Sequence, residues 1–528
     1  MVNFRRQFPA ALPTLAILVV FAVYLKTLLP GVGYSGDTSK FQFVGRVLGT
    51  PHEPGSPSYV MLNYIWVTLF PLGATGFKAN LLSAVFSVLA LFVLSRTLLL
   101  LGVRHSLAAV VTLTFGFTYT LWSQSVIAEV YSLNVLFVAL TLHYFLWWHL
   151  QGKYRDFLIA CTVYAFSFGD HLIVVTFLPA IAYFVWKTKK EFFWNPRVIG
   201  QIALVIVLGA AQYGYLFWRY YSSETSYLEI AVPDVKTLWY YVSGGQFHSY
   251  FFVAGAKGVL FLNSPLILRL VWLEYLLLLP ISLLGFVVLK GTPVRTFLLI
   301  GVLVTLGFTL AYSINDIFVY LLPVYLILAM TLGTGLEWLF TKCPGRYLRF
   351  LGVAIGCVPV FFLAHNYSMA DQSRNTNAKQ MVEQSLRSIQ KDALIICPDY
   401  DFAEHFWYYI FAEGKSRDGV HALFSHEDDL PVHDLELYIG KGKPFYLPME
   451  RRMTPPGLTV YYCTAYEPPV FDRMRSRYPW NREMLNEYRR SFVFVPMKKM
   501  NEDGFRFIPV ADSLYRIERL SELRLPEH

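Results

Sequence analysis

Six short polar clusters interrupt an otherwise apolar chain, and one of them holds a carboxylate well placed for acid–base chemistry. Asp37 follows a Gly in the sequence Ser-Gly-Asp-Thr and precedes an amphipathic stretch, Phe41 to Leu48. A carboxylate in such a loop can accept a proton from an incoming hydroxyl group, which is the role of a general base. The alternative is a structural role as the N-cap of the following helix. We predict that Asp37 is the catalytic residue.

The other clusters supply candidates for substrate binding. His52 and Glu53 precede a rigid Pro-Gly-x-Pro turn, where the histidine can meet a phosphate group. Each candidate also has a structural alternative: solvation in a turn, interaction with a helix dipole, or a satisfied histidine in the core. The predicted substrate-binding residues are His52, Glu53, Glu129, Tyr131, His171, Asn315 and Asp316.

Basic residues between positions 219 and 269 are candidates for phosphate binding. Fixed cations stabilise the negative charge that develops on a phosphate leaving group. The alternative is that they bind lipid headgroups. The predicted phosphate-binding residues are Arg219, His248, Lys257 and Arg269.

Membrane-spanning helices must position these residues, because the composition is too apolar for water to be the main solvent. Hydrophobic residues make up 55% of the chain and charged residues only 15%, whereas charged residues alone reach roughly a quarter of a soluble protein. A span needs about twenty mostly apolar residues, and we count about eleven candidates. They cover approximately residues 11–29, 78–101, 106–122, 127–149, 156–169, 171–187, 198–218, 264–289, 296–313, 317–340 and 347–365.

The distribution of Lys and Arg predicts the topology. Basic residues concentrate in short cytoplasmic loops, and the basic clusters fall together on one side only if residues 57–72 form an interfacial helix that does not cross. The formal net charge of +9 then reflects topology and anionic lipid, and we expect no nucleic-acid partner. All six polar clusters fall on the opposite, outer face. Because ionisable groups at membrane depth face protein interiors or aqueous cavities, we predict a cleft there.

The chain after residue 366 is polar enough to be a soluble domain. We predict strands at 393–396, 444–447, 458–463 and 492–495, and helices near 376–390, 401–413 and 481–490, which together make a small α/β domain. The five cysteines form no CxxC pair, and only Cys397 and Cys463 are expected to meet. The predicted domains are therefore a transmembrane domain, 1–366, with outer loops 30–77 and 219–263, and an extracytoplasmic domain, 367–528.

Several motifs carry a resemblance to a known family. Around Asp37, and in His52-Glu-Pro-Gly-x-Pro-x-Tyr59 and Glu129-Val-Tyr-x-Leu-Asn134, the chain resembles the protein O-mannosyltransferase-like family of GT-C membrane glycosyltransferases. Residues 315–323 and 371–409 agree with it. The resemblance implies a GT-C-like polytopic helical fold and transfer of a monosaccharide, often mannose, from a polyprenyl or dolichyl phosphate to a hydroxyl, with inversion. In that scheme Asp37 matches the base.

One departure from the family stands next to Asp37. Relatives usually read Asp-Ser-Gly-Glu where this chain has Asp37-Thr-Ser-Lys40, so that Lys40 replaces an acid. Glu53 likewise stands where relatives tend to have Pro. If the missing acid helps catalysis or binds a metal in relatives, this protein uses Glu53, dispenses with that acid, or has changed substrate.

We therefore expect an inverting glycosyltransferase of a bacterial inner membrane, with its site and C-terminal domain in the periplasm. Its partners would be membrane lipid, a polyprenyl- or dolichyl-phosphate sugar as co-substrate, and a protein, lipid or glycan acceptor. No cofactor is indicated, and a need for divalent metal stays open. The alternatives are a multi-span transporter or flippase of lipid-linked solutes, which should show internal repeats, and a noncatalytic assembly factor.

Overall fold

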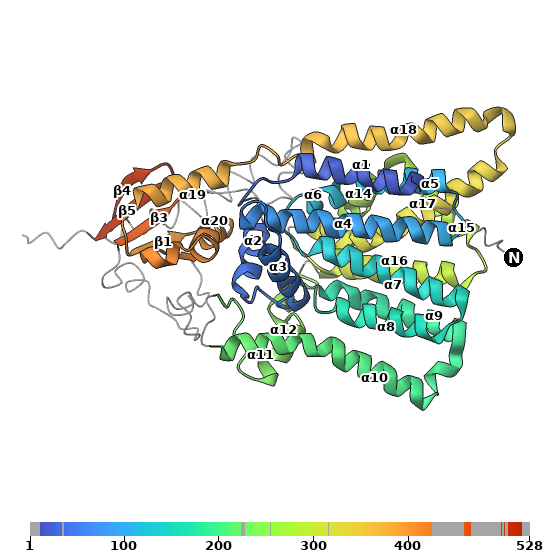
Figure 1. Ribbon diagram of the computed structural model, residues 1–528, viewed down its shortest axis with the longest axis horizontal. Coiled ribbons are helices and arrows are strands. Elements are labelled where there is room, and N and C mark those ends of the chain that lie inside the picture. Colours follow the sequence, from blue (N-terminus) through green and yellow to red (C-terminus); the bar gives the residue numbers. More distant parts are fainter. Residues whose placement is uncertain are drawn as a thin grey trace, which may run out of the picture.

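The protein is an elongated molecule in which a bundle of long helices is joined at one end to a smaller domain (Figure 1). The computed structural model describes residues 11–33, 36–222, 227–253, 255–314, 316–424, 459–465, 498, 501 and 505–519. α1 (Ala11–Thr27) begins at the end of the bundle opposite the small domain. The connections that were predicted to lie on the outer face, those that carry α2, α3 and α12, gather at the end next to the small domain.

The bundle is built from long apolar helices, because only helices satisfy every backbone group within lipid. Its principal helices are α1 (Ala11–Thr27), α2 (Thr38–Val47), α3 (Pro57–Leu69), α4 (Thr75–Leu100), α5 (His105–Gly116), α6 (Tyr119–Ser125), α7 (Tyr131–Gln151), α8 (Tyr154–Ser167), α9 (Leu178–Lys189), α10 (Pro196–Ala210), α11 (Gly214–Tyr221), α12 (Val235–Val242), α14 (Ser264–Tyr275), α15 (Leu279–Val288), α16 (Pro293–Ala311), α17 (Leu322–Lys342) and α18 (Gly345–Ala370). α17 lies at the centre, with every residue from 322 to 336 buried.

The number of spans agrees with a polytopic membrane protein. Within the described residues, eight helical runs are long and apolar enough to cross a membrane, and the pair α5 and α6, bent by 68°, brings the number to nine. The other two of the eleven predicted spans are α1, of 17 residues, and α8, of 14 residues. They differ from the rest in length, since 14 residues of helix reach only about 21 Å.

α2 and α3 lie across the end of the bundle, between it and the small domain (Figure 1). At 13 residues, α3 is too short to span a bilayer and corresponds to the predicted interfacial helix. The two helices approach closely at Gly45, where a Cβ atom would lie 2.5 Å from the Asn63 side chain. The Asn63 amide donates a hydrogen bond to the Phe41 carbonyl at 2.8 Å, which fixes this packing.

The turn between α2 and α3 is held against the loop after α8. The Ser56 hydroxyl donates to the Asp170 carbonyl at 2.8 Å, and the Ser58 amide donates to the Gly169 carbonyl at the same distance. Gly55 has a φ of +88° and lies against Leu216, so a side chain there would meet both strain and a clash. These contacts fix the position of residues 52 and 53.

The small domain contains a five-stranded mixed sheet of order β2-β1-β3-β5-β4. β1 pairs in parallel with β2 and β3, whereas β5 is antiparallel to β3 and β4. Its elements are α19 (Asn377–Ser388), β1 (Ala393–Cys397), α20 (Tyr400–Trp407), β2 (His421–Phe424), β3 (Thr459–Cys463), β4 (Phe505–Ala511) and β5 (Leu514–Arg519). The strands predicted at 393–396 and 458–463 and the helices near 376–390 and 401–413 are present; those predicted at 444–447, 481–490 and 492–495 lie outside the described residues.

Candidate active site

The ammonium group of Lys40 lies at the centre of a buried cluster of charged side chains. Its Nζ atom is 2.8 Å from Oδ1 of Asp37, 3.0 Å from Oε2 of Glu229 and 3.2 Å from Oε1 of Glu404. Nδ1 of His52 is 3.1 Å away. Because an ammonium group only donates hydrogen bonds, Nδ1 accepts, and the neutral ring carries its hydrogen on Nε2. We call these five residues the Lys40 cluster.

Local helix geometry brings Asp37 and Lys40 together. Asp37 occupies the N-cap position of α2 but makes no capping hydrogen bond. Its carboxylate turns instead to Lys40, three residues later and one turn along the helix. The capping alternative considered for Asp37 is therefore not what the structure shows.

A short pairing between two loops brings in Glu229. The Thr50 amide donates to the Tyr227 carbonyl at 3.1 Å, and the Glu229 amide donates to the Thr50 carbonyl at 2.9 Å. The hydroxyls of Tyr227 and Tyr400 then donate to the Glu229 carboxylate at 3.0 and 2.8 Å. The carboxylate is thus fixed by two phenols in addition to Lys40.

The small domain contributes to the same cluster through α20. Glu404 accepts a hydrogen bond from the Lys40 backbone amide at 3.1 Å, and the Ser39 hydroxyl lies 2.6 Å from Nδ1 of His405. Asp401 accepts a hydrogen bond from the Gly36 amide at 3.3 Å. Contacts from three residues of α20 therefore join residues 36 to 40 of the membrane domain to a helix more than 360 residues later.

Burial and ion pairing oppose each other in this cluster. Burial alone would raise the pKa of Asp37, but the electrostatic interactions with the His52 ring and the Lys40 ammonium, together with the hydrogen bond from Lys40, outweigh it and lower the pKa to about 2. Burial alone would lower the pKa of Lys40, yet the carboxylates raise it well above its usual range. For Glu404 burial dominates, and its pKa is raised well above the usual range despite Lys40. Lys40 is therefore always charged, Asp37 is ionised, and Glu404 binds a proton most readily.

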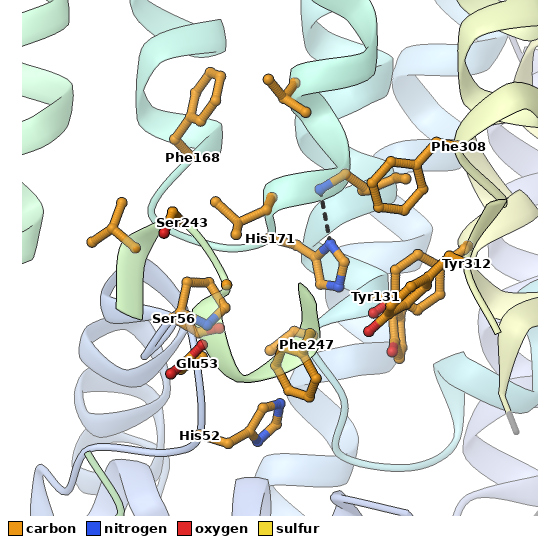
Figure 2. Close-up of a pocket in the computed structure, with 18 of the residues that line it drawn as sticks. His52, Glu53, Ser56, Tyr131, Phe168, His171, Ser243, Phe247, Phe308 and Tyr312 are labelled. Atoms are coloured by element: carbon orange, nitrogen blue, oxygen red, sulfur yellow. Dashed lines mark hydrogen bonds between the residues drawn. The ribbon is translucent and has the colours of Figure 1, made fainter. Parts of the chain in front are cut away.

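A cavity of about 500 Å³ opens beside the Lys40 cluster. Figure 2 shows His52, Glu53 and Ser56 on one side of it, Tyr131, Tyr312 and Phe308 on the other, and Phe247 between them. Asp37, Glu129, His171, His248 and Tyr320 also line it. Lys40, Glu229 and Glu404 do not, so the cluster meets the cavity through Asp37 and His52. The lining residues place seven of the predicted site residues around one space.

Glu53 forms part of this cavity wall with one unused oxygen. Its Oε2 accepts a hydrogen bond from the Gln246 amide at 2.9 Å, whereas Oε1 is buried and has no hydrogen-bond partner among the described residues. Burial raises the pKa of Glu53 to about 7, against the opposing effect of the Gln246 amide. The carboxyl group therefore exchanges its proton near neutral pH.

Two further carboxyl groups lie on the side of Tyr131. The Tyr131 hydroxyl donates to Oδ2 of Asp316 at 3.1 Å, and the Thr38 hydroxyl donates to Oε1 of Glu129 at 3.3 Å. Burial and the nearby charge of Asp37 raise the pKa of Asp316 to about 6 and that of Glu129 well above its usual range. Neighbouring Asn315 lies outside the described residues.

His171 is a neutral wall residue. Its Nδ1 accepts a hydrogen bond from the Ile173 amide at 3.1 Å, which caps the short helical turn that follows. Burial lowers the pKa of His171 to about 3. The ring packs against Tyr131 and Tyr320 at centroid distances of 5.4 and 5.1 Å. His171 thus offers a hydrogen-bonding edge without a positive charge.

The four predicted phosphate-binding residues lie in different places. His248 lines the cavity. Arg219 is buried, donates to the Val47 carbonyl at 3.4 Å and lies over the Trp218 ring. Lys257 is exposed and Arg269 is half-buried on α14. The structure thus brings one of the four to the cavity.

Sequence reasoning did not select Glu229, Tyr400, Glu404 or His405. Glu229 lies in the predicted outer loop and Glu404 in the predicted helix 401–413, but neither stands in a motif with Asp37. One signal was available: a lysine in a buried loop requires carboxylate partners, because an unpaired buried charge is too costly. That signal indicates that partners exist without naming them.

Residues 37–193 match a family model described as the protein O-mannosyl-transferase TMEM260 N-terminal domain. The protein O-mannosyl-transferase TMEM260 of Mus musculus is 29% identical over 206 residues, which cover 38% of this chain and 29% of the mouse protein. Its counterpart in Dictyostelium discoideum is 21% identical over 211 residues, 37% of this chain and 26% of that protein. The chain thus matches less than a third of the length of these relatives. These matches confirm the resemblance that the motifs indicated.

Solved structures agree on the fold. The crystal structure of ArnT from Cupriavidus metallidurans bound to undecaprenyl phosphate aligns with a TM-score of 0.57 at 11% identity, covering 98% of this chain and 100% of ArnT. The Archaeoglobus fulgidus oligosaccharyltransferase, in a complex with Zn and sulfate, aligns with a TM-score of 0.50 at 11% identity, covering 86% and 68%. The predicted fold class is confirmed: a multi-pass helical membrane protein of the GT-C type with a small sheet domain at its C-terminus.

Proposed function

We propose that this protein is an inverting glycosyltransferase that moves a monosaccharide, predicted to be mannose, from a polyprenyl- or dolichyl-phosphate sugar to a hydroxyl of a protein, lipid or glycan. The observation that carries the proposal is one cavity, next to a buried ion cluster, in which Asp37, His52 and Glu129 meet. All three residues fall within 37–193, the region that matches a protein O-mannosyl-transferase domain. The proposed face is extracytoplasmic, which in a bacterial inner membrane is the periplasmic side, because the basic loops lie at the other end of the helices.

In the proposed reaction the acceptor oxygen attacks the anomeric carbon from the face opposite the phosphate. The bond from that carbon to the phosphate oxygen breaks, the lipid phosphate leaves with the electron pair, and the configuration inverts. The acceptor proton passes to a carboxylate oxygen of Asp37. A single displacement needs one such carboxylate, whereas retention would need a second one as nucleophile.

The ion pair with Lys40 suits Asp37 to this role in one respect and limits it in another. A pKa of about 2 keeps the carboxylate ionised at every physiological pH, so it is always ready to accept a proton. It also makes Asp37 a weak base. Asp37 therefore takes the proton late, after bonding to the anomeric carbon has made the acceptor hydroxyl strongly acidic.

An apolar groove supports a lipid-linked donor. A second cavity, of about 580 Å³, lies between α8, α9 and α10 and has an almost wholly apolar wall. Phe168 and Val242 line both this groove and the candidate active-site cavity. A polyprenyl chain lying in the groove would present its phosphate at the polar cavity. ArnT, a fold relative, binds such a lipid phosphate in its crystal structure.

Histidines at the cavity are the groups we assign to the phosphate. His52 has its Nδ1 occupied by Lys40 and carries a hydrogen on Nε2, so it can donate one hydrogen bond without being charged. His248 lies at the same cavity and is exposed. Donors fixed in this way stabilise negative charge on a leaving phosphate.

A metal ion does not fit the residues beside Asp37. The archaeal fold relative is a complex with zinc, but here the Lys40 ammonium fills the space between Asp37, Glu229 and Glu404. Among the residues that the structure describes, no three His, Cys, Asp or Glu side chains are arranged to hold a metal. No step of the proposed reaction is assigned to one.

The direct test is transfer by the purified full-length protein. It is incubated with radiolabelled polyprenyl-phosphate mannose or glucose and with peptide, lipid and glycan acceptors. The proposal expects transfer from one donor, inversion at the product linkage, and loss of transfer by at least about a hundredfold in Asp37→Asn, because an amide does not accept the proton. The variant should remain folded but melt at a somewhat lower temperature, because the buried Lys40 ammonium keeps a hydrogen-bond acceptor and loses an ion pair. No transfer from any donor, or an unchanged rate in Asp37→Asn, would count against the proposal.

A further inference from the structure

The Lys40 cluster has the side chains of a cation-binding site, but the cation is the ammonium group of Lys40 itself. Three carboxyl groups, from Asp37, Glu229 and Glu404, point at one Nζ atom from distances of 2.8 to 3.2 Å. They come from three segments far apart in the sequence. The Tyr400 ring closes a further side, with its centroid 4.8 Å from Nζ.

The burial of this cluster shows why a cation is needed there. The side chains of Lys40 and Glu404 are 1% and 0% exposed, that of Glu229 is 18% exposed, and that of Asp37, which faces the cavity, is 35% exposed. Carboxylates so close together in a site of low dielectric repel each other strongly. Without a central positive charge, the carboxyl groups would have to take up protons or move apart. Asp37 would then lose both its charge and its orientation.

Carboxylate oxygens are also the ligands that hard divalent cations such as Mg²⁺ and Mn²⁺ prefer. A metal would draw these oxygens to about 2.0–2.6 Å, whereas they lie 2.8 to 3.2 Å from the Lys40 nitrogen, as hydrogen-bond acceptors in Asp37 and Glu229 and as an ion-pair partner in Glu404. An ammonium group and a metal ion cannot occupy this centre together. The Lys40 ammonium and a bound metal ion would therefore each neutralise the same carboxylates, one in place of the other.

We propose that the Lys40 ammonium is the fixed cation of this active site, so that catalysis needs no added divalent metal and removal of the lysine converts the cluster into a divalent-cation site. The inference rests on the proposed function only where it concerns catalysis. Because Lys40 does not line the cavity, it is a positioning residue, and it acts through Asp37 and His52.

The experiment uses the full-length protein in detergent and measures both melting temperature and sugar transfer. Wild type, Lys40→Ala and Lys40→Arg are compared in EDTA, Mg²⁺ and Mn²⁺. We expect wild type to be indifferent to EDTA and to added metal in both measurements. In EDTA, Lys40→Ala should melt at a lower temperature than wild type. Its melting temperature should rise with Mn²⁺ concentration, and it should then regain part of its sugar transfer. Lys40→Arg should remain metal-independent.

Matched controls separate a specific site from general metal effects. Lys78 is a half-buried lysine whose ammonium donates to the Val67 carbonyl at 3.1 Å, and no carboxylate of the described residues forms an ion pair with it, so Lys78→Ala should show no response to Mn²⁺. The double variant Lys40→Ala/Glu404→Gln should lose the response, because it has lost a ligand.

Each result decides the inference. Inactivation of wild type by EDTA with recovery in Mn²⁺, or a Mn²⁺ response in Lys40→Ala no larger than in Lys78→Ala, would overturn it. If Lys40→Ala does not fold, the effect of EDTA on wild type and the metal independence of Lys40→Arg still test the inference. If wild type transfers no sugar at all, the proposed function fails, while the melting temperatures still test the cation site.

Discussion

The Nζ atom of Lys40 lies 3.2 Å from a carboxylate oxygen of Glu404, although 364 residues separate the two in the chain. Both side chains are fully buried. A helix of the C-terminal domain is therefore not an appendage to the membrane domain but part of the wall behind its candidate active site.

Removing Glu404 should destabilise the protein and disturb the site at once. Glu404→Ala removes one of the three carboxyl groups around the buried Lys40 ammonium and the acceptor of the Lys40 backbone amide, and we expect a loss of about 3 kcal/mol. Glu404→Gln should cost less, because burial already favours the protonated form of this residue. Melting temperature and urea unfolding of the C-terminal domain would measure the difference.

An exposed pair in the same domain provides the control for that measurement. Lys379 and Glu383 lie 3.8 Å apart on the surface of α19. Lys379→Ala should change stability by less than about 0.5 kcal/mol. Equal effects of Lys379→Ala and Glu404→Ala would show that the buried contact contributes nothing special.

Glu53 should make stability depend on pH in a specific direction. Its pKa is raised from 4.5 to about 7, so the folded state holds the proton more tightly than the unfolded state. Stability from this group is complete below pH 4.5, falls as pH rises towards 7, and is flat above that. Over that window wild type should lose on the order of 3 kcal/mol relative to Glu53→Gln. Melting curves of wild type and Glu53→Gln at pH 5 and pH 8 measure this loss. The same change in melting temperature in both proteins would refute a raised pKa.

Filling the apolar groove should weaken the use of a long lipid donor. Ala182 is a small exposed residue in the wall of the groove, so Ala182→Trp occupies the space without replacing a core side chain. We expect KM for a polyprenyl donor to rise about tenfold, with little change for a short-chain analogue. Leu283→Trp, at an exposed position on α15 away from the groove, is the control. An equal effect on both donors would argue against a tail in the groove.

The predicted phosphate ligands can be separated by position. His248 lines the cavity whereas Lys257 is exposed away from it. His248→Ala should raise KM for the donor severalfold, and Lys257→Ala should leave it unchanged, because a screened surface charge contributes little. Inhibition by free polyprenyl phosphate should likewise weaken in His248→Ala and stay unchanged in Lys257→Ala. The reverse order would assign the phosphate to the loop after α12.

The sequence by itself determined the polytopic helical membrane architecture, and it predicted a two-part organisation and a catalytic role for Asp37. These follow from local properties: the length of apolar segments, the side on which Lys and Arg gather, and short motifs such as the one around His52. The sequence also predicted an interfacial position for residues 57–72, because a crossing there would have inverted every later loop.

Only the tertiary structure decided what surrounds Asp37. The sequence indicated that Lys40 stands where relatives have an acid, but its partners Glu229 and Glu404 are chosen by packing between distant segments. Stacking of Phe43 on Phe411, at a centroid distance of 5.6 Å, sets the placement of α2 against the helical segment that ends at Ala412. Electrostatic energy depends on such distances in space rather than on spacing along the chain, so the sequence did not show which residues surround Lys40.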